Sequence, residues 1–284
     1  MWSRCDDTAG QVKTRAGFPK PEERHSDSLS RWIRPFALTL SVLACSTTAA
    51  AQSSGQLWGN LTLERLASER LVYTLDVEPK VQVTATTGPS RFANVDVWPS
   101  VDFAVSGWFD AHGEFLVAFT NQEDGSNSTE LTERMGARLH ILSRLIQDRA
   151  ARRGAEREAQ PRRRGTIATL LRFEHRDLLK NDAPTTSSWR FRARMELAYP
   201  LNRPKLTANG TLYLTSDTEL FVPVSNDPQQ HQVNQWRLRN GVGYRVSFNT
   251  RFEALYIWTT KRNSETGQFA TDSQAFDFRV KMAF

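Results

Sequence analysis

The sequence contains no long hydrophobic run. None of its apolar stretches approaches the roughly 18 consecutive residues that a membrane-spanning helix needs, and the mean hydropathy is -0.52. A helical membrane protein is therefore excluded. A membrane β-barrel is not excluded, because lipid-facing and lumen-facing side chains alternate along its strands and keep the average hydropathy low.

Cysteine is nearly absent, since Cys5 and Cys45 are the two cysteines of the 284 residues. Both lie in the N-terminal segment that we expect to be removed on export, as described below. The remaining chain then has no disulfide framework, no zinc-thiolate site and no cysteine nucleophile. With 39% hydrophobic and 24% charged residues, the chain also lacks the composition of a wholly disordered protein.

The N-terminal segment has the pattern of an export signal. Two arginines, a short apolar stretch and a run of small residues follow one another between Arg31 and Gln52. A basic region, a short apolar region and an A-x-A site predict a cleavable secretory signal peptide. We place the cleavage between Ala51 and Gln52, with Ala49 and Ala51 as the small residues of the site.

An alternative for the same segment is lipid modification. Val42–Cys45 resembles a lipobox, which would make Cys45 a lipidated N-terminus. On the first interpretation, residues 1–51 are an N-terminal extension plus a cleavable signal peptide. Residues 52–284 are then a single domain in the mature, exported protein.

The clearest structural signal is a period of two between Trp189 and Tyr199. The odd-numbered positions are Trp, Phe, Ala, Met, Leu and Tyr, and the even-numbered ones are three arginines, a glutamate and an alanine. Because successive side chains of a strand point to opposite faces, this segment predicts a strand with one apolar and one charged face. In a helix the same residues would spread charge over every face.

The alternation recurs, in places more weakly, along the chain after Gln52. Strands are expected at residues 56–66, 70–86, 92–105, 113–121, 130–145, 165–177, 189–199, 204–216, 236–248, 250–258 and 276–284. Bacterial single-chain barrels normally have an even number of strands, so we expect one more strand hidden within 70–86 or 218–224. The predicted fold is all-β, a transmembrane antiparallel up-and-down β-barrel of about 10 to 12 strands.

Short turns and longer polar links are predicted to alternate between these strands. The turns are at 67–69, 107–113, 200–204 and 247–249, and the links are at 121–129, 178–188, 216–233 and 261–273. Outer-membrane barrels have this asymmetry, with short periplasmic turns and longer extracellular loops.

A soluble β-sandwich or lipocalin-like barrel is the alternative architecture, with the apolar face inward and the arginines in water. Two features favour the membrane barrel. Tryptophan and tyrosine occupy apolar positions near strand ends, as interfacial girdles require: Trp58, Tyr73, Trp98, Trp189, Tyr199, Trp236, Tyr244 and Trp258. The final strand also has the form of an assembly signal for the barrel-assembly machinery, with apolar residues at alternate positions: Phe276, Phe278, Val280, Met282 and Phe284.

Several segments together resemble a known family. They are residues 191–201, 212–214 with 219–221, 234–238 and 241–244, and residues 56–60 with 63–64 fit the opening strand. They resemble the family catalogued as domain of unknown function 2490, over almost all of residues 56–284. The resemblance implies a Gram-negative outer-membrane β-barrel and carries no catalytic residues. The chain departs from the family in an arginine-rich insert.

Charged side chains occupy the face opposite the apolar one and are predicted to point into the lumen. The candidates are Arg172, Arg176, Arg190, Arg192, Arg194, Glu196, Arg237, Arg239, Arg245, Arg251, Glu253 and Arg279. One interpretation is a salt-bridged lumen, in which arginines satisfy carboxylates across strands. The other is an anion-selective constriction for phosphate or carboxylate solutes. The surplus of arginine over acid in this set favours a role for anions.

The arginine-rich insert spans residues 146–164. Eight arginines against three acids lie between Arg144 and Arg164, so most of the formal net charge of +6 is local and does not imply a nucleic-acid partner. The insert could grip lipopolysaccharide phosphates. A solvated surface loop is the simpler interpretation, because blocks of like charge are usually exposed.

No pattern in the chain predicts catalysis. The histidines after the signal are His112, His140, His175 and His231, with His140 expected inward and His175 outward, and no G-x-S-x-G motif accompanies them. The loop acids do not have the spacing of a calcium-binding motif, so we expect neither a metal nor a cofactor.

The sequence therefore predicts a non-enzymatic barrel in the bacterial outer membrane. Its function is predicted to be a narrow pore or transporter for small anionic solutes. The alternatives are a non-conducting structural or lipid-interacting barrel and, less favoured, a lipid-modifying enzyme that would depend on His140. The expected partners are outer-membrane lipids, lipopolysaccharide and the barrel-assembly machinery.

Overall fold

The computed structural model describes residues 54–84, 92–122, 125–141, 165–181, 183–224, 233–263 and 266–284. The predicted cleavage site at Ala49, Ala51 and Gln52 lies outside the described residues, as do Cys45, the insert 146–164 and His231. The predictions made for these residues stay predictions. Within the described ranges, no helix is long and apolar enough to cross a membrane.

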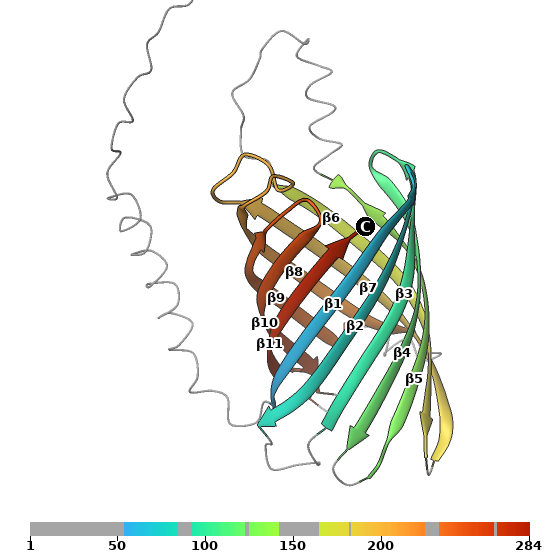
Figure 1. Cartoon of the computed structure of the whole chain (residues 1–284). Coiled ribbons are helices and arrows are strands. Elements are labelled where there is room, and N and C mark those ends of the chain that lie inside the picture. The colour runs from blue at the N-terminus through green and yellow to red at the C-terminus, as the bar shows by residue number, and fades with distance from the viewer. Residues whose placement is uncertain are drawn as a thin grey trace, which may run out of the picture. The chain divides into compact units, whose positions relative to one another are not determined.

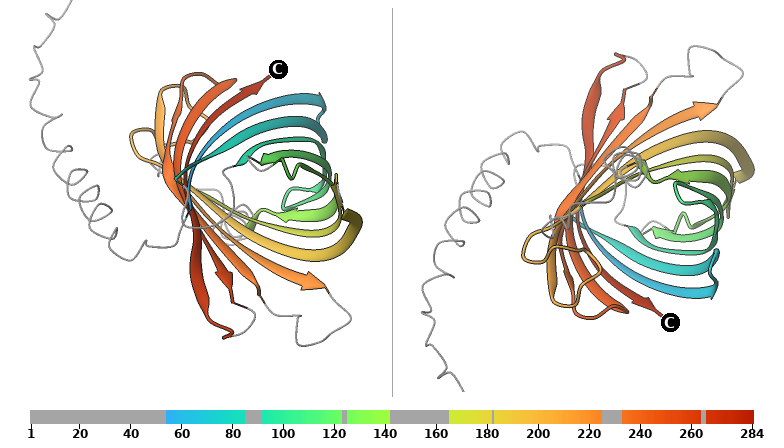
Figure 2. Two further views of the ribbon diagram at one scale, coloured as in Figure 1. Left: turned by 90° about the horizontal axis from the view of Figure 1, so that it is seen from below. Right: turned by 90° about the horizontal axis from the view of Figure 1, so that it is seen from above.

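Eleven strands form the described part of the chain, and each strand pairs with its neighbours in chain order to close a barrel (Figure 1). The strands are β1 (Ser54–Ser68), β2 (Leu71–Thr84), β3 (Phe92–Ser106), β4 (Phe109–Gln122), β5 (Ser128–Leu139), β6 (Thr166–Lys180), β7 (Ala183–Pro200), β8 (Thr211–Val224), β9 (Gln235–Arg245), β10 (Thr250–Arg262) and β11 (Phe269–Ala283). The end-on views of Figure 2 show them following one another around a ring. The prediction of an all-β barrel is confirmed.

Side chains along each strand alternate between the interior and the outer surface. On β11, Phe276 and Phe278 are 59% and 56% exposed, whereas Asp277 between them is fully buried. Each of the eleven strands carries at least one large hydrophobic side chain on the outer surface: Leu57, Tyr73, Phe103, Phe115, Met135, Phe173, Phe191, Leu214, Tyr244, Phe252 and Phe276. The barrel is therefore apolar outside and polar inside, as the period of two predicts.

The odd strand number makes the barrel close through a parallel pair. β1 runs beside β11 in the same direction, from the pair Ser54 and Ser273 to the pair Glu64 and Ala283. All other neighbours are antiparallel. The expectation of a hidden strand is therefore wrong for the described residues: 70–86 contains the single strand β2, and 218–224 is the second half of β8.

The first strand begins at one end of the barrel, and the last strand finishes at the other. We call the end where β1 begins the N-terminal mouth and the end where β11 finishes the C-terminal mouth. The connections at the C-terminal mouth are 69–70, 107–108, 140–165, 201–210 and 246–249. Those at the N-terminal mouth are 85–91, 123–127, 181–182, 225–234 and 263–268.

The predicted asymmetry between short turns and long links is correct in part. All four predicted turns lie at the C-terminal mouth and all four predicted links at the N-terminal mouth. The lengths differ from the prediction, because the longest connection, 140–165, opens on the C-terminal mouth, and the two-residue turn 181–182 lies at the N-terminal mouth. The predicted link 178–188 is mostly strand, because β6 continues to Lys180 and β7 begins at Ala183. Its serines and threonines resemble a polar loop in the sequence, but threonine is also a favourable strand residue.

The predicted strand 204–216 is displaced, because β8 covers Thr211–Val224. The preceding residues form a connection that is held by the Asn202 side chain. Its Nδ2 donates to the Gly210 carbonyl at 2.9 Å, and its Oδ1 accepts from the Leu212 backbone N–H at 2.7 Å. Gly210 has a φ of 70°, a conformation that favours glycine, and it ends the turn just before the strand.

Two of the predicted girdle aromatics point inward. Trp58 is only 6% exposed and packs with Ile257 and Ala275, and Trp98 lines the interior. Tyr73, Trp189, Tyr199 and Tyr244 are exposed on the outside. Trp58 and Trp98 point inward because they occupy even-numbered positions of β1 and β3. The even-numbered neighbours Asn60 and Asp96 also line the interior.

Candidate functional site

A cavity of about 1050 Å³ occupies the barrel interior. Its lining includes Arg245, Arg251 and Lys281 near the C-terminal mouth and Gln235 and Lys261 near the N-terminal mouth. The cavity therefore extends along the barrel from one end to the other.

All twelve charged residues that the sequence places in the lumen line this cavity. They are Arg172, Arg176, Arg190, Arg192, Arg194, Glu196, Arg237, Arg239, Arg245, Arg251, Glu253 and Arg279. The five residues of the predicted assembly signal point the other way: among them, Phe276, Phe278 and Phe284 are well exposed on the outside.

Two fully buried glutamates organise the middle of the interior. Glu219 on β8 accepts from Arg172 Nη2 at 3.1 Å, Arg192 Nε at 3.0 Å and Arg239 Nη2 at 2.9 Å. Glu174 on β6 accepts from Arg190 Nε at 2.8 Å and Arg192 Nη1 at 2.7 Å. Glu219 is thus shared by arginines from three strands, and Glu174 by two arginines of β7.

Further ion pairs extend this cluster in two directions. Toward β4, Arg172 Nη1 donates to Glu114 at 3.0 Å, and Arg134 contacts both Glu114 and Glu174. Toward β9, Asp217 lies 2.9 Å from Arg194 and 2.6 Å from Arg239. We call these residues the central network: Glu114, Arg134, Arg172, Glu174, Arg190, Arg192, Arg194, Asp217, Glu219 and Arg239.

The central network fits its buried position because its charges are paired. Isolated ions in a protein interior are strongly disfavoured, and arginine forks compensate carboxylates through two or more hydrogen bonds. Arg172 bridges β6 to Glu114 on β4 and to Glu219 on β8, so the contacts also cross the sheet. With four acids against six arginines, the network compensates most of its buried charge, and it narrows the interior.

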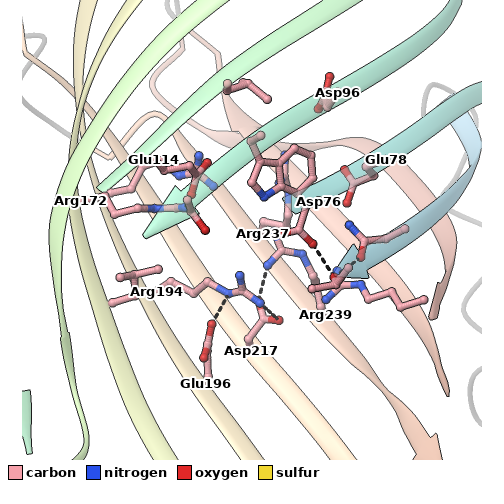
Figure 3. Close-up of a pocket in the computed structure, with 18 of the residues that line it drawn as sticks. Asp76, Glu78, Asp96, Glu114, Arg172, Arg194, Glu196, Asp217, Arg237 and Arg239 are labelled. Atoms are coloured by element: carbon pink, nitrogen blue, oxygen red, sulfur yellow. Dashed lines mark hydrogen bonds and ion pairs between the residues drawn. The ribbon is translucent and has the colours of Figure 1, made fainter. Parts of the chain in front are cut away.

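An acidic wall on β1–β4 faces the arginines and was missed by the sequence analysis. It contains Glu64, Asp76, Glu78, Asp96, Asp102, Asp110 and Glu114. Lys80 bridges two of them, lying 2.8 Å from Glu78 and also contacting Asp96. Figure 3 shows Asp76, Glu78 and Asp96 on this wall pointing into the same space as the arginines.

The signal for the acidic wall is present in the sequence. Asp76, Glu78 and Lys80 occupy alternate positions of the predicted strand 70–86, in the same period that identified the arginines. The surplus of arginine inferred from the candidate set is therefore a property of β5–β11. On β1–β4 the described lining has seven acids and one lysine among its charged residues.

Arg237 is held between aromatic rings. Its guanidinium lies 5.4 Å from the centre of the Trp58 ring and 5.2 Å from that of Phe221. Its nearest carboxylate contact is to Glu219, at 3.8 Å, beyond hydrogen-bonding distance. Arg237 therefore keeps more of its charge directed to the cavity than the arginines of the central network do.

The interior histidines are bound to acids. His112 is placed between Asp102, 2.8 Å from Nδ1, and Glu114, 3.2 Å from Nε2, so neither ring nitrogen is left to activate a nucleophile. His140 points inward as expected, with Nε2 2.6 Å from Asp110. His175 does not line the cavity and, as expected, is on the outer face, where it stacks on Trp189 with ring centres 4.4 Å apart.

The acidic and histidine side chains of the described residues do not form a cluster suited to a metal ion. Within the described ranges, no group of three or more His, Cys, Asp or Glu side chains could hold a metal ion. The acids of the interior bind arginine, lysine, histidine or hydroxyl groups instead, as Asp76 does with Thr62.

The chain is similar to a protein family over most of its length. A family model described as protein of unknown function (DUF2490) matches residues 55–270. The match runs from β1 to the start of β11 and includes the strands that carry the central network. No curated protein matches the chain.

Proposed function

The chain belongs to the DUF2490 family of proteins of unknown function, and we propose that it is an outer-membrane β-barrel whose lumen is a narrow pore for small anionic solutes. The predicted signal peptide supports export. The observation that carries the proposal is the charged cavity that reaches both mouths of a barrel with an apolar exterior.

The exterior supports membrane insertion. Large hydrophobic side chains are exposed on every strand, whereas soluble monomers rarely expose contiguous apolar patches larger than a few hundred Å². A closed barrel also satisfies its backbone hydrogen bonds between strands, which lipid requires. On this proposal the partners are outer-membrane lipids and lipopolysaccharide around the barrel, and the barrel-assembly machinery at β11.

The lining supports preference for anions. Arginines and lysines of β5–β11 are directed to the cavity, while Glu174, Glu219 and Asp277 are fully buried behind them. With the acidic wall included, the described lining has 15 arginines and lysines against 12 carboxylates, so a passing anion meets a modest excess of positive groups. Rings of arginine and lysine favour anions in other pores by the same electrostatics.

The central network limits the size of the solute. Arg172, Arg192 and Arg239 converge on Glu219 from three strands and occupy part of the cross-section. We therefore expect small conductance and passage of simple inorganic or carboxylate ions rather than of sugars or peptides.

The test is single-channel recording on the folded barrel in planar bilayers. Heat-modifiable gel migration first establishes folding. We expect small, stable steps and a reversal potential on the anion side in a salt gradient. Arg237→Gln should shift the reversal potential toward cation preference, and Lys180→Gln, at an exposed position of β6, should not.

A non-conducting structural or lipid-interacting barrel is the second candidate. The contacts of Arg172 with both β4 and β8 favour it, because they reach over the intervening strands β5 and β7 and take up part of the interior. A folded barrel that inserts into bilayers without current would support this candidate and reject the pore.

A further inference from the structure

Three cations lie side by side inside the C-terminal mouth. Arg251 on β10 is paired in register with Arg245 on β9 and with Lys281 on β11. All three line the cavity. We call Arg245, Arg251 and Lys281 the cationic row. Like charges placed directly opposite on neighbouring strands repel each other, so this arrangement needs compensation.

The carboxylates near the cationic row compensate it poorly. Arg251 lies 3.7 Å from Glu64 and 3.9 Å from Glu253, and Lys281 lies 3.8 Å from Glu253. These separations exceed those of normal hydrogen bonds. In the central network, by contrast, Arg239 and Asp217 are 2.6 Å apart.

Glu253 is drawn toward another partner. The Tyr213 hydroxyl donates to its Oε1 at 2.7 Å, which uses part of its capacity to accept from the row. Arg245 donates from Nη1 to the Phe248 carbonyl at 2.7 Å, a neutral acceptor. The Nε atoms of Arg245 and Arg251 are both buried without a hydrogen-bond acceptor, so the polar groups of the two arginines are incompletely satisfied. Positive charge is therefore left undercompensated on this side of the cavity, at residues that line it.

We propose that the cationic row is a binding site for the phosphate group of a small soluble compound. A tetrahedral oxyanion can accept from two guanidinium groups and an ammonium at once, through charge-assisted hydrogen bonds that arginine makes particularly well. It would also remove the repulsion among the three cations. The site rests on the proposed pore for access, because the cationic row faces the interior and not the outer surface. Recognition of phosphate depends on the three cations alone.

The test is calorimetric titration of inorganic phosphate into the folded full chain in a nonionic detergent at low ionic strength. We expect binding of phosphate and none of chloride at equal concentration. Arg251→Gln should lower the affinity about tenfold, the effect of losing one charge-assisted hydrogen bond. Arg65→Gln is the matched control, because Arg65 carries the same charge on the exposed face of β1 near the same mouth.

Two outcomes would overturn the site: no phosphate binding by the unaltered chain, or an equal loss of affinity in Arg65→Gln. Lys281→Gln repeats the test on another strand if Arg251→Gln does not fold. Displacement of bound phosphate by added lipopolysaccharide would assign the phosphate to a lipid and reject the soluble ligand.

The titration and the single-channel recording together distinguish this site from the pore. Phosphate binding by a barrel that carries no current would leave the site standing and reject the pore. Current that phosphate neither blocks nor reduces, with no heat of binding, would leave the pore standing and reject the site.

Discussion

The central network and the cationic row use the same residue types in opposite ways. Around Glu219, arginines from three strands approach one carboxylate within hydrogen-bonding distance. In the row, three cations are neighbours in register, and their nearest carboxylates lie 3.7 to 3.9 Å away. The electrostatic environment of an arginine therefore differs from place to place within one interior, according to how closely carboxylates approach it. Pairing makes the first region structural, and incomplete pairing makes the second available to a ligand.

The largest effect should come from removing the central acid. Glu219→Gln leaves Arg172, Arg192 and Arg239 without their shared carboxylate in a buried site. We expect the free energy of unfolding to fall by about 3–5 kcal/mol, as when one partner of a buried ion pair is removed. Urea unfolding of the barrel in lipid vesicles, followed by tryptophan fluorescence, measures this change.

A matched acid at the edge of the cationic row provides the contrast. Glu64→Gln removes a carboxylate that is partly exposed and lies 3.7 Å from Arg251, beyond hydrogen-bonding distance. Its effect should stay below about 1 kcal/mol. Equal losses in the two variants would contradict the distinction between a paired centre and an underpaired mouth.

An intermediate loss of stability is expected when the contact between Tyr213 and Glu253 is disturbed. The Tyr213 ring lies over Gly243, where an added Cβ would be 2.2 Å from a ring atom. Gly243→Ala should therefore displace Tyr213 from Glu253 and reduce stability by about 1–3 kcal/mol. The same urea experiment measures this loss.

Gly59→Ala is the control for that substitution. Its new Cβ would meet only Pro79 Cγ, at an ordinary 3.6 Å. If Gly243→Ala proved as stable as Gly59→Ala, the close packing of Tyr213 on β9 would be rejected.

The smallest effect has the opposite sign. Arg251→Gln removes repulsion within the cationic row, so in the absence of phosphate we expect stability to rise by about 0.2–1 kcal/mol at low salt. At 1 M salt the screening length is about 3 Å, and the gain should shrink toward zero. Unfolding of the unaltered and Arg251→Gln barrels at two salt concentrations tests this, and a loss of stability at low salt would show that Arg251 is already compensated.

Much of the lumen could be predicted because it depends on a local rule. Alternation between Trp189 and Tyr199 assigns Arg190, Arg192 and Arg194 to one face, and the structure directs all three to the cavity. The same rule applied to Asp76 and Glu78 would have found the acidic wall. The rule was less informative for Trp58 and Trp98, because an aromatic residue suits either a lipid-facing girdle or a packed interior.

Strand ends were harder to predict than strand faces. The start of β8 depends on hydrogen bonds that Asn202 makes to residues eight and ten positions later. The length of the β6–β7 hairpin depends on pairing between segments that resemble a polar loop when read alone. Such contacts form only when two parts of the chain meet.

By itself, the sequence determined which side chains share a face, because the period of two is a property of each strand's own backbone. It also determined the family and the all-β fold. Only the tertiary structure decided that eleven strands close through a parallel pair of β1 and β11. It alone decided which charges are compensated, because an ion pair across strands depends on register and closure. Arg192 meets Glu219 while Arg251 faces Arg245 and Lys281 for that reason.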